Sequence, residues 1–221
     1  MEYILFDLDG TITDSQLGIK NSVAYALNHF GIKVDNMDSL NKYIGPPLRQ
    51  SFMTFAGLSE ENSHIGMTKY REYYGPKGIF ENELYSGIVE LFKKLKNDNK
   101  KIVLATSKPW IYAEIILEHF NIKKYFDFVA GSELNGVRTK KDDVIKYAID
   151  KYNIDTNNAI MIGDRQHDIL GAKANGIKTI GVLYGFGSKD ELESAGADYI
   201  AKNTEDIYNI INDLEVIYWI F

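Results

Sequence analysis

The sequence contains no cysteine, which excludes disulfide bonds and thiolate metal sites and is compatible with a reducing compartment. It also lacks an excess of positive charge: the net charge is −6, whereas a nucleic-acid-binding surface is usually basic. No apolar run approaches the ~20 residues that a membrane-spanning helix needs. At the N-terminus, no basic segment leads into an apolar one as in an export signal. We therefore expect a cytoplasmic protein that binds neither nucleic acid nor a membrane.

What the sequence does contain is enough apolar material for a core, with 45% hydrophobic and 25% charged residues in a chain of 221. Continuous aliphatic and β-branched runs, typical of strands buried on both faces, occur at residues 3–6, 101–106, 159–163 and 178–184, with weaker candidates at 126–131 and 197–201. Segments of helical periodicity lie between the later runs, at 109–120, 140–152 and 166–176. This alternation predicts an α/β fold with a Rossmann-like, doubly wound parallel sheet.

One long interval interrupts the alternation. Between the first two runs the sequence shows no convincing strand, and it has helical patterns at residues 15–31, 38–45 and 59–75. A further helix, at 87–100, leads back into the sheet. We therefore predict an inserted helical domain at residues 15–84 and a core formed by residues 1–14 and 85–221.

Two acids follow the first predicted strand: Asp7 and Asp9, with Gly10 and Thr11 directly after them. Ligands of an open parallel sheet bind beyond the carboxyl ends of its strands, and residues i and i+2 of an extended segment point the same way. Both carboxylates can therefore face one pocket. A hairpin turn does not fit, because no return strand follows, and a calcium loop would need its glycine at position 6 instead of 4. A solvated loop is the remaining alternative.

A second pair of acids follows another predicted strand. Asp164 comes directly after residues 159–163, and Asp168 lies one helical turn later. Taken alone, this pair is explained by a helix cap and a surface residue. Two strand ends that each carry two carboxylates, however, offer the oxygen ligands that Mg²⁺ prefers. The sequence therefore predicts a magnesium site.

Hydroxyl and ammonium groups follow other strand and loop segments. Thr106 and Ser107 end the second predicted strand before a helix whose first amides could bind an anion, although simple capping also explains them. Lys140 and Lys141 lie at the start of another predicted helix. A lysine at such a position is usually solvated, but one that lies over the pocket could neutralise phosphate charge.

Together these motifs resemble those of the haloacid dehalogenase-like (HAD-like) hydrolase superfamily, and the resemblance covers the whole chain. Residues 7–11 resemble its DxDGT signature, residues 104–107 its second motif, and residues 163–168 its fourth. The third motif is a lysine that is most similar to Lys141, although its usual KPxP setting is absent and Lys140 stays an alternative. The helical insert resembles the cap of the phosphoglycolate phosphatase-like branch. The resemblance thus implies an α/β core with an inserted α-helical cap domain.

The resemblance also implies magnesium-dependent hydrolysis of a small phosphomonoester through an aspartyl-phosphate. Asp7 would attack the phosphorus, while Asp9 would protonate the leaving oxygen and later take a proton from water. Mg²⁺ would be held by Asp7, the main-chain carbonyl of Asp9 and Asp164, with Asp168 in a supporting role. The phosphate oxygens would contact the remaining groups of the motifs, which are Thr106, Lys141 and the amides of Gly10 and Ser107.

Specificity is less well defined by the sequence. The expected partner is a small phosphorylated metabolite, such as phosphoglycolate, a sugar phosphate or a nucleotide, and the protein is expected to be a monomer or weak homodimer. Arg49, in the insert, would contact an anionic part of the substrate or be a surface arginine, and residues 184–188 could border the pocket. The apolar residues 216–221 suit a terminal core strand or an exposed docking patch.

Other activities fit parts of the same pattern. A phosphomutase or pyrophosphatase of the superfamily would share the architecture, and a receiver-like regulatory module would also carry an acidic pocket that is phosphorylated on Asp. The large helical insert argues against the receiver-like module. A kinase is disfavoured because the sequence has no GxxxxGK[ST] loop.

Overall fold

The structure is a computed structural model that describes the backbone of residues 1–218 and the side chains of residues 1–214. The chain divides into two compact units: a core unit, Met1–Thr13 with Leu84–Phe221, and an insert unit, Asp14–Glu83. The boundaries predicted from the sequence lie one residue later at each junction.

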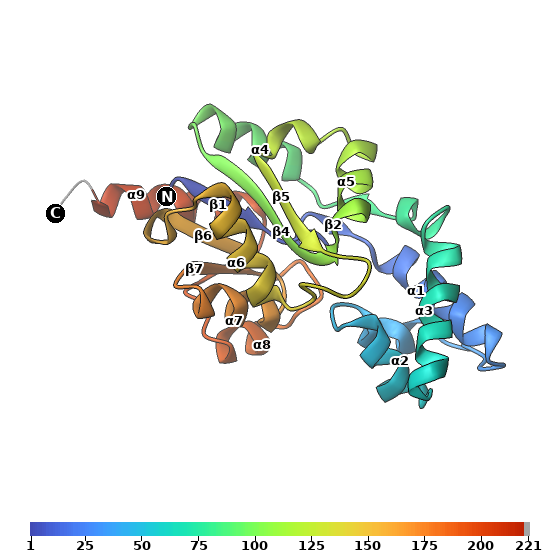
Figure 1. Ribbon diagram of the computed structural model, residues 1–221. Coiled ribbons are helices and arrows are strands. Elements are labelled where there is room, and N and C mark those ends of the chain that lie inside the picture. Colours follow the sequence, from blue (N-terminus) through green and yellow to red (C-terminus); the bar gives the residue numbers. More distant parts are fainter. Residues whose placement is uncertain (219–221) are drawn as a thin grey trace. The chain divides into compact units, whose positions relative to one another are not determined.

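The core unit is built on a six-stranded parallel sheet with the order β5-β4-β1-β6-β7-β8 (Figure 1). The strands are β1 (Tyr3–Phe6), β4 (Lys101–Pro109), β5 (Phe128–Ser132), β6 (Ala159–Gly163), β7 (Lys178–Val182) and β8 (Tyr199–Ala201). The chain leaves β1 first toward β4 and β5 on one side and then crosses to β6 on the other. This reversal makes the carboxyl end of β1 a topological switch point, where open α/β sheets bind ligands. The predicted α/β class and doubly wound sheet are confirmed.

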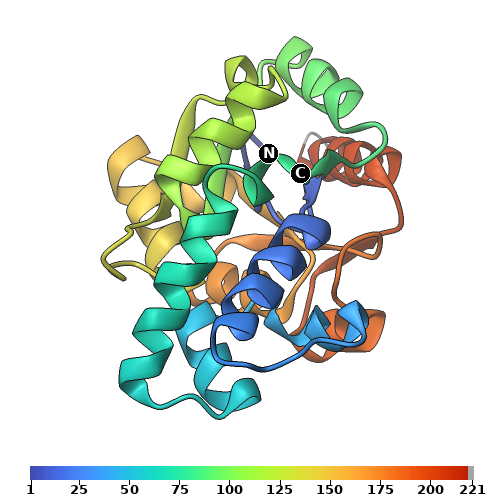
Figure 2. The ribbon, with the colours of Figure 1, turned by 90° about the vertical axis from the view of Figure 1, so that its right-hand side faces the viewer.

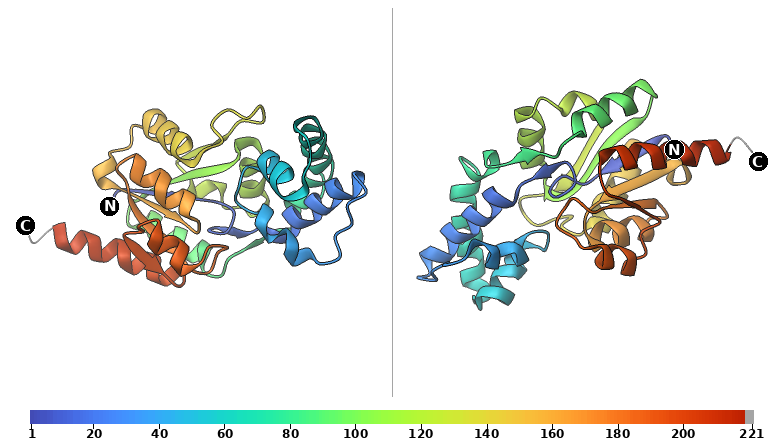
Figure 3. Two further views of the ribbon diagram at one scale, coloured as in Figure 1. Left: turned by 90° about the horizontal axis from the view of Figure 1, so that it is seen from below. Right: turned by 180° about the vertical axis from the view of Figure 1, so that it is seen from behind.

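Helices cover both faces of this sheet, which explains why its strands are continuous apolar runs. They are α4 (Ile88–Asn97), α5 (Trp110–His119), α6 (Lys141–Tyr152), α7 (Gln166–Ala174), α8 (Lys189–Ser194) and α9 (Thr204–Tyr218), with the short 3₁₀ helices η3 (Lys123–Tyr125) and η4 (Thr156–Asn158). Helices α6 and α7 pack together on the face that Figure 1 shows in front. Helices α4 and α9 pack together, and α9 lies in front in the view from behind (Figure 3, right).

The insert unit is helical. It contains α1 (Gln16–His29), α2 (Leu48–Ala56), α3 (Glu60–Tyr74) and the 3₁₀ helices η1 (Met37–Tyr43) and η2 (Gly78–Phe80). Helices α1 and α3 lie side by side along much of their length (Figure 2). The predicted helix at 38–45 is the 3₁₀ helix η1. The junctions with the core unit contain two short paired strands, β2 (Thr13–Asp14) and β3 (Glu83–Leu84), which are too short to produce a recognisable pattern in the sequence.

The C-terminal part of the chain differs from the predicted strand. Residues 216–218 belong to α9, whose inner face is formed by the buried side chains of Ile207, Ile211 and Leu214. This i, i+4, i+7 spacing is present in the sequence and indicates a helix. The side chains beyond Leu214 and residues 219–221 lie outside the described part of the chain, and so does the predicted docking patch. Among the helices of residues 1–218, none is both long and apolar enough to span a bilayer.

Candidate active site

The register of the three central strands brings the two acidic motifs to the same edge of the sheet. Phe6, the last residue of β1, is level with Leu104 of β4 and with Ile162 of β6. The backbone N–H of Asp7 donates a hydrogen bond to the Ile162 carbonyl at 3.0 Å, so Asp7 continues directly from the strand. Asp164 follows the end of β6 in the same way. The two carboxylates therefore leave neighbouring parallel strands at their carboxyl ends, as predicted.

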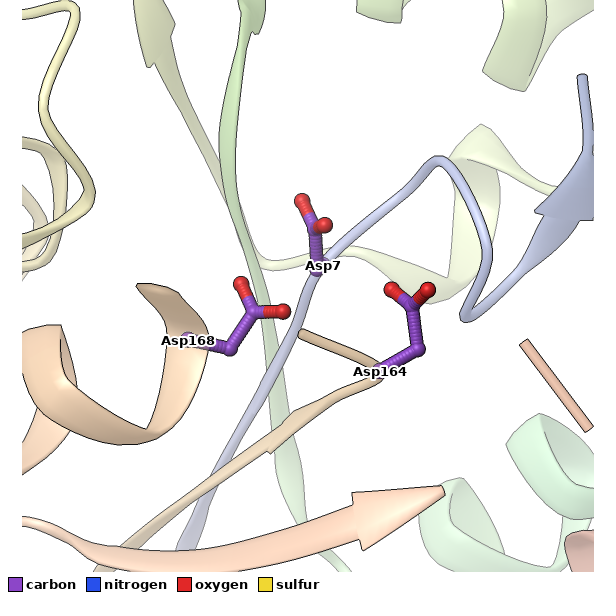
Figure 4. A group of neighbouring side chains, drawn as sticks. All are labelled: Asp7, Asp164 and Asp168. Carbon is purple, nitrogen blue, oxygen red and sulfur yellow. The ribbon is translucent and has the colours of Figure 1, made fainter. Parts of the chain in front are cut away.

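Three carboxylates form a compact cluster at this edge. Asp7, Asp164 and Asp168 are all buried, and each offers an oxygen within 4.8 Å of the others (Figure 4). They come from the ends of β1 and β6 and from the first turn of α7. Figure 4 shows the three side chains converging on a common space. A cluster of this kind has the oxygen-only donor set that suits a hard divalent cation.

Lys141, at the start of α6, connects two of these carboxylates. Its ammonium lies 2.6 Å from Asp7 Oδ1 and 2.8 Å from Asp168 Oδ1, and it donates a hydrogen bond to the Ala105 carbonyl at 3.0 Å. The side chain is 4% exposed. Lys140, the neighbouring residue, is the exposed N-cap of the helix. The structure therefore places Lys141 in the site and not the alternative that the sequence left open.

The electrostatics of the cluster are dominated by burial. Burial raises the pKa of Asp7 to about 6, with Lys141 opposing the shift and Asp168 adding to it. Burial also raises the pKa of Asp164 well above its usual range, and the nearby Asp168 and Asp7 carboxylates raise it further. For Lys141, burial lowers the pKa, but the carboxylates of Asp168 and Asp7 outweigh this effect and the net shift is upward. The ammonium therefore stays charged.

The charges of this site fit a divalent cation. If all three carboxylates are ionised, the Lys141 ammonium compensates one of their charges and leaves two negative charges uncompensated. Such an excess is costly in a buried site, and Mg²⁺ carries the matching charge and prefers oxygen ligands. The carboxylate cluster of Asp7, Asp164 and Asp168 thus fits the ion. From the sequence, we predicted the Asp9 carbonyl as a metal ligand and gave Asp168 only a supporting role. The structure shows the Asp168 carboxylate within the cluster.

Hydrogen bonds from two loops hold the Asp164 carboxylate in place. The Thr11 hydroxyl donates to Oδ1 at 3.2 Å, and the Phe186 backbone N–H donates to Oδ2 at 2.8 Å. Tyr184 donates its hydroxyl to the Thr11 carbonyl at 3.0 Å, and burial raises the pKa of this phenol, so it stays protonated. A Cβ on Gly185 would lie 2.3 Å from the Asp164 Cβ, so that position needs glycine. The loop at 184–188 therefore packs directly on Asp164.

The second acid of the first motif has a cation of its own. Asp9 Oδ2 lies 2.8 Å from the ammonium of Lys108, whose side chain is 7% exposed. The Lys108 backbone N–H donates to Oγ1 of the buried Thr106 at 3.2 Å. The β4–β5 register shifts between Ala105 and Pro109, and bulges of this kind redirect side chains near active sites. The sequence reasoning missed Lys108, although it directly follows Ser107 at the end of the strand.

Comparison with known proteins agrees with this geometry. The family model described as "Haloacid dehalogenase-like hydrolase" matches residues 4–182, which is most of the chain. The chain belongs to this family. The resemblance inferred from the four motifs is therefore confirmed, and with it the prediction that the protein is an enzyme of the hydrolase class.

Individual relatives of this HAD-like hydrolase carry different names. A 5′-nucleotidase of Pseudomonas aeruginosa is 44% identical over 86% of this chain and 86% of its own. A protein of Mycobacterium tuberculosis named tyrosine-protein kinase PtkA is 35% identical over 90% of this chain and 68% of its own. The crystal structure of a predicted phosphatase from Clostridium acetobutylicum is 48% identical and superposes with a TM-score of 0.93, covering 96% of this chain and 98% of that one.

Gly10, whose amide is predicted to contact phosphate, lies in a tight turn beside Asp164. Its N–H donates a hydrogen bond to the Thr13 carbonyl at 2.8 Å, so this donor is already used within the loop. Its φ of +87° favours glycine, and a Cβ here would lie 2.2 Å from Asp164 Oδ2. The phosphate-binding amide at Gly10 therefore stays a prediction, and it requires the N–H to leave the Thr13 carbonyl. What the structure shows is that this residue provides the space that Asp164 occupies.

A Gly10→Ala variant is therefore expected to lose more stability than an alanine at an open glycine. Gly176→Ala is the matched control, because Gly176 also has a positive φ, of +70°, but no atom lies within 4 Å of its Cβ position. Both variants incur backbone strain of about 1–2 kcal/mol, and only Gly10→Ala also displaces Asp164. Urea denaturation measures the two free energies of unfolding. Equal losses in the two variants would show that the contact with Asp164 has no energetic consequence.

Arg49 belongs to the insert unit, where it lies at the start of α2 and forms an ion pair with Glu60. Its side chain is 41% exposed. This acidic partner within its own unit agrees with the alternative of a surface arginine. The remaining residues predicted for the site, by contrast, all belong to the core unit.

Proposed function

We propose that this HAD-like hydrolase is a magnesium-dependent phosphatase that hydrolyses a small phosphomonoester through an aspartyl-phosphate on Asp7. The observation that carries the proposal is the buried Asp7 carboxylate, which lies at the switch point of the sheet, within 4.8 Å of two further carboxylates and in contact with Lys141. A second acid, Asp9, lies two residues away and contacts a different cation. This arrangement separates a nucleophile from a proton carrier.

In the first half-reaction, a carboxylate oxygen of Asp7 bonds to phosphorus while the bond from phosphorus to the ester oxygen breaks. Asp9 gives its proton to that oxygen, which leaves as an alcohol. In the second, water attacks the same phosphorus and Asp9 takes its proton, so that inorganic phosphate leaves and the Asp7 carboxylate is restored. In both steps Lys141 and Thr106 would contact the phosphate oxygens. Bound Mg²⁺ would supply charge neutralisation to the phosphate and to the carboxylate cluster.

The two acids can take different roles because their surroundings differ. Asp7 is buried with two other carboxylates beside one ammonium, whereas Asp9 forms an ion pair with Lys108 and its side chain is 20% exposed. The nucleophile must be ionised, and the Lys141 ammonium and a bound Mg²⁺ would favour that state of Asp7. Asp9, once protonated on Oδ1, would still accept a hydrogen bond from Lys108 through Oδ2. The charge on the transferring phosphoryl group is stabilised by groups that are already in position, which is the main requirement of phosphoryl transfer.

Among the substrates expected from the sequence, a nucleoside 5′-monophosphate is favoured. This preference rests on the relative that is 44% identical over 86% of the chain and is named 5′-nucleotidase. Phosphoglycolate and sugar phosphates are the competing substrates. The partner of the protein is in each case a small phosphorylated metabolite.

The test is a measurement of phosphate release from a nucleoside 5′-monophosphate, phosphoglycolate and a sugar phosphate, each with Mg²⁺ and with EDTA. We expect release with Mg²⁺, the highest kcat/KM for the nucleotide, and recovery when Mg²⁺ is added back after EDTA. Release that is insensitive to EDTA would overturn the metal requirement. Transfer of the phosphoryl group without release would identify a phosphomutase.

One relative favours a second candidate function. The Mycobacterium tuberculosis protein that is 35% identical carries the name of a tyrosine-protein kinase, although this chain has no GxxxxGK[ST] loop. The same site could pass a phosphoryl group from Asp7 to a tyrosine hydroxyl instead of to water. Incubation with ATP and a tyrosine peptide distinguishes the two: phosphopeptide without release of inorganic phosphate would favour the kinase.

A further inference from the structure

We propose that Lys108 is a positioning residue for Asp9, which it holds by one carboxylate oxygen so that the other faces the leaving group. This inference rests on the proposed phosphatase activity, in which Asp9 serves the ester oxygen.

The contact that carries the proposal is a largely buried ion pair outside the carboxylate cluster. Asp9 Oδ2 and the Lys108 ammonium are 2.8 Å apart, with the two side chains 20% and 7% exposed. Asp9 Oδ1 is also buried, and it has no hydrogen-bond partner among the described residues. Buried polar atoms without a partner are costly, so an oxygen left in this state next to a reaction site indicates a place for a ligand atom.

The main chain fixes the position of the lysine. The Lys108 N–H is bonded to the hydroxyl of Thr106, and both residues lie in the irregular stretch of β4 between Ala105 and Pro109. A lysine that only solvates the surface would extend into water, whereas this one is nearly enclosed. Burying an ammonium is costly unless it is paired, so the ion pair with Asp9 is what allows Lys108 to be buried in this loop.

The two acids of the first motif thus have separate cations. Lys141 contacts Asp7 and Asp168, and Lys108 contacts Asp9. Without Lys108, the Asp9 carboxylate would be free to rotate about its side-chain bonds. Proton transfer requires heavy atoms within about 2.6–3.2 Å, and a misplacement of ~1 Å can cost ~10²-fold in rate. The expected consequence is a loss of kcat with little change in KM.

The leaving group provides a selective readout of this role. A nucleoside 5′-monophosphate releases an alkoxide, which needs a proton as it departs. p-Nitrophenyl phosphate releases p-nitrophenolate, which is stable enough to leave without one. We expect Lys108→Met to lower kcat by ~10²-fold for the nucleotide. For p-nitrophenyl phosphate, we expect the rate of the phosphorylation step to fall by less than about tenfold. The pre-steady-state release of p-nitrophenolate measures this rate. Lys108→Arg, which retains a charged donor, should recover part of the loss for the nucleotide.

The experiment measures kcat and KM for both esters, and the p-nitrophenolate burst, with Mg²⁺ in the wild type and four variants. The variants are Lys108→Met, Lys108→Arg, the double variant Asp9→Asn/Lys108→Met and the control Lys140→Met, whose lysine is exposed at the start of α6. In the Asp9→Asn background, loss of Lys108 should have almost no further effect, because residues that act as a unit are not additive. Lys140→Met should match the wild type.

Several outcomes would overturn the proposal. Equal losses for both esters in the phosphorylation step, or a loss that persists at full size in the Asp9→Asn background, would mean that Lys108 acts on the fold or on phosphate. A rise in KM without a fall in kcat would make it a substrate-binding residue. If Lys108→Met fails to fold, Lys108→Arg must show a smaller loss of kcat that is again larger for the nucleotide than for p-nitrophenyl phosphate. A wild-type protein that releases phosphate from neither ester would instead refute the proposed function.

Discussion

An Asp7→Asn variant is expected to lose phosphate release by ~10⁴-fold or more, the scale seen when a covalent nucleophile is removed from an enzyme. An amide cannot form the acyl phosphate, so the reaction has no covalent route left. The side chain keeps its shape and volume, and Lys141 keeps its contact with Asp168. Circular dichroism should therefore show an unchanged fold. Asp35→Asn, at an exposed aspartate of the insert unit, is the control for the chemical change and should be fully active.

The same variant tests the electrostatics of the cluster without metal. Asp7 has a pKa of about 6 in the folded protein against an ordinary value of 3.8, so the fold binds the proton more tightly than the unfolded chain does. The wild type should therefore lose stability in EDTA as the pH rises from 3.8 to about 6, and Asp7→Asn should lack this contribution. Urea denaturation at several pH values measures it. An identical pH dependence of the free energy of unfolding in the two proteins would contradict the raised pKa of Asp7. Near-wild-type turnover in the variant would contradict its role as the nucleophile.

An Asp9→Asn variant is expected to fall by ~10²–10⁴-fold in steady-state turnover, the usual loss of one general acid–base group. The rate of the second half-reaction falls for every substrate, because the Asp9 carboxylate is no longer present to take the proton of the attacking water. The rate of the first half-reaction falls only when the leaving oxygen needs a proton. With p-nitrophenyl phosphate, the variant should therefore release a stoichiometric burst of p-nitrophenolate and then turn over slowly.

The burst separates the two acids. Asp7→Asn should show none, because the variant cannot form the intermediate, whereas Asp9→Asn should accumulate it. Stopped-flow absorbance in Mg²⁺ measures the burst amplitude against enzyme concentration. A burst in Asp7→Asn, or its absence in Asp9→Asn together with wild-type steady-state rates, would show that the roles of nucleophile and proton carrier are wrongly divided.

Much of the core fold was predictable because the buried parallel strands have an unambiguous pattern. The runs 3–6 and 159–163 coincide with β1 and β6, and the acids that follow them lie together as the sheet requires. The sequence favoured Lys141 but left Lys140 as an alternative, because it does not show which of two adjacent side chains at the start of a helix points to the sheet. The contacts of Lys141 with Asp7 and Asp168 decide it.

The features that the sequence did not predict depend on contacts between distant residues or on irregular backbone. Lys108 reaches Asp9 from an irregular stretch at the end of β4, and no periodicity indicates where such a stretch will point. The Gly10 amide is used by Thr13, a local turn bond that the DxDGT pattern does not show. The loop around Phe186 was expected near the pocket, but its hydrogen bond to Asp164 joins residues 22 positions apart.

The most direct test of the account is to identify the residue that carries the phosphoryl group. Wild-type protein is mixed with a radiolabelled phosphomonoester and Mg²⁺, quenched in acid within one turnover, digested and analysed by mass spectrometry. We predict label on the peptide that contains Asp7, removed by hydroxylamine as an acyl phosphate would be, and no label in Asp7→Asn. Label on the peptide that contains Asp164 and Asp168, or rapid phosphate release with no labelled peptide at any time, would contradict it.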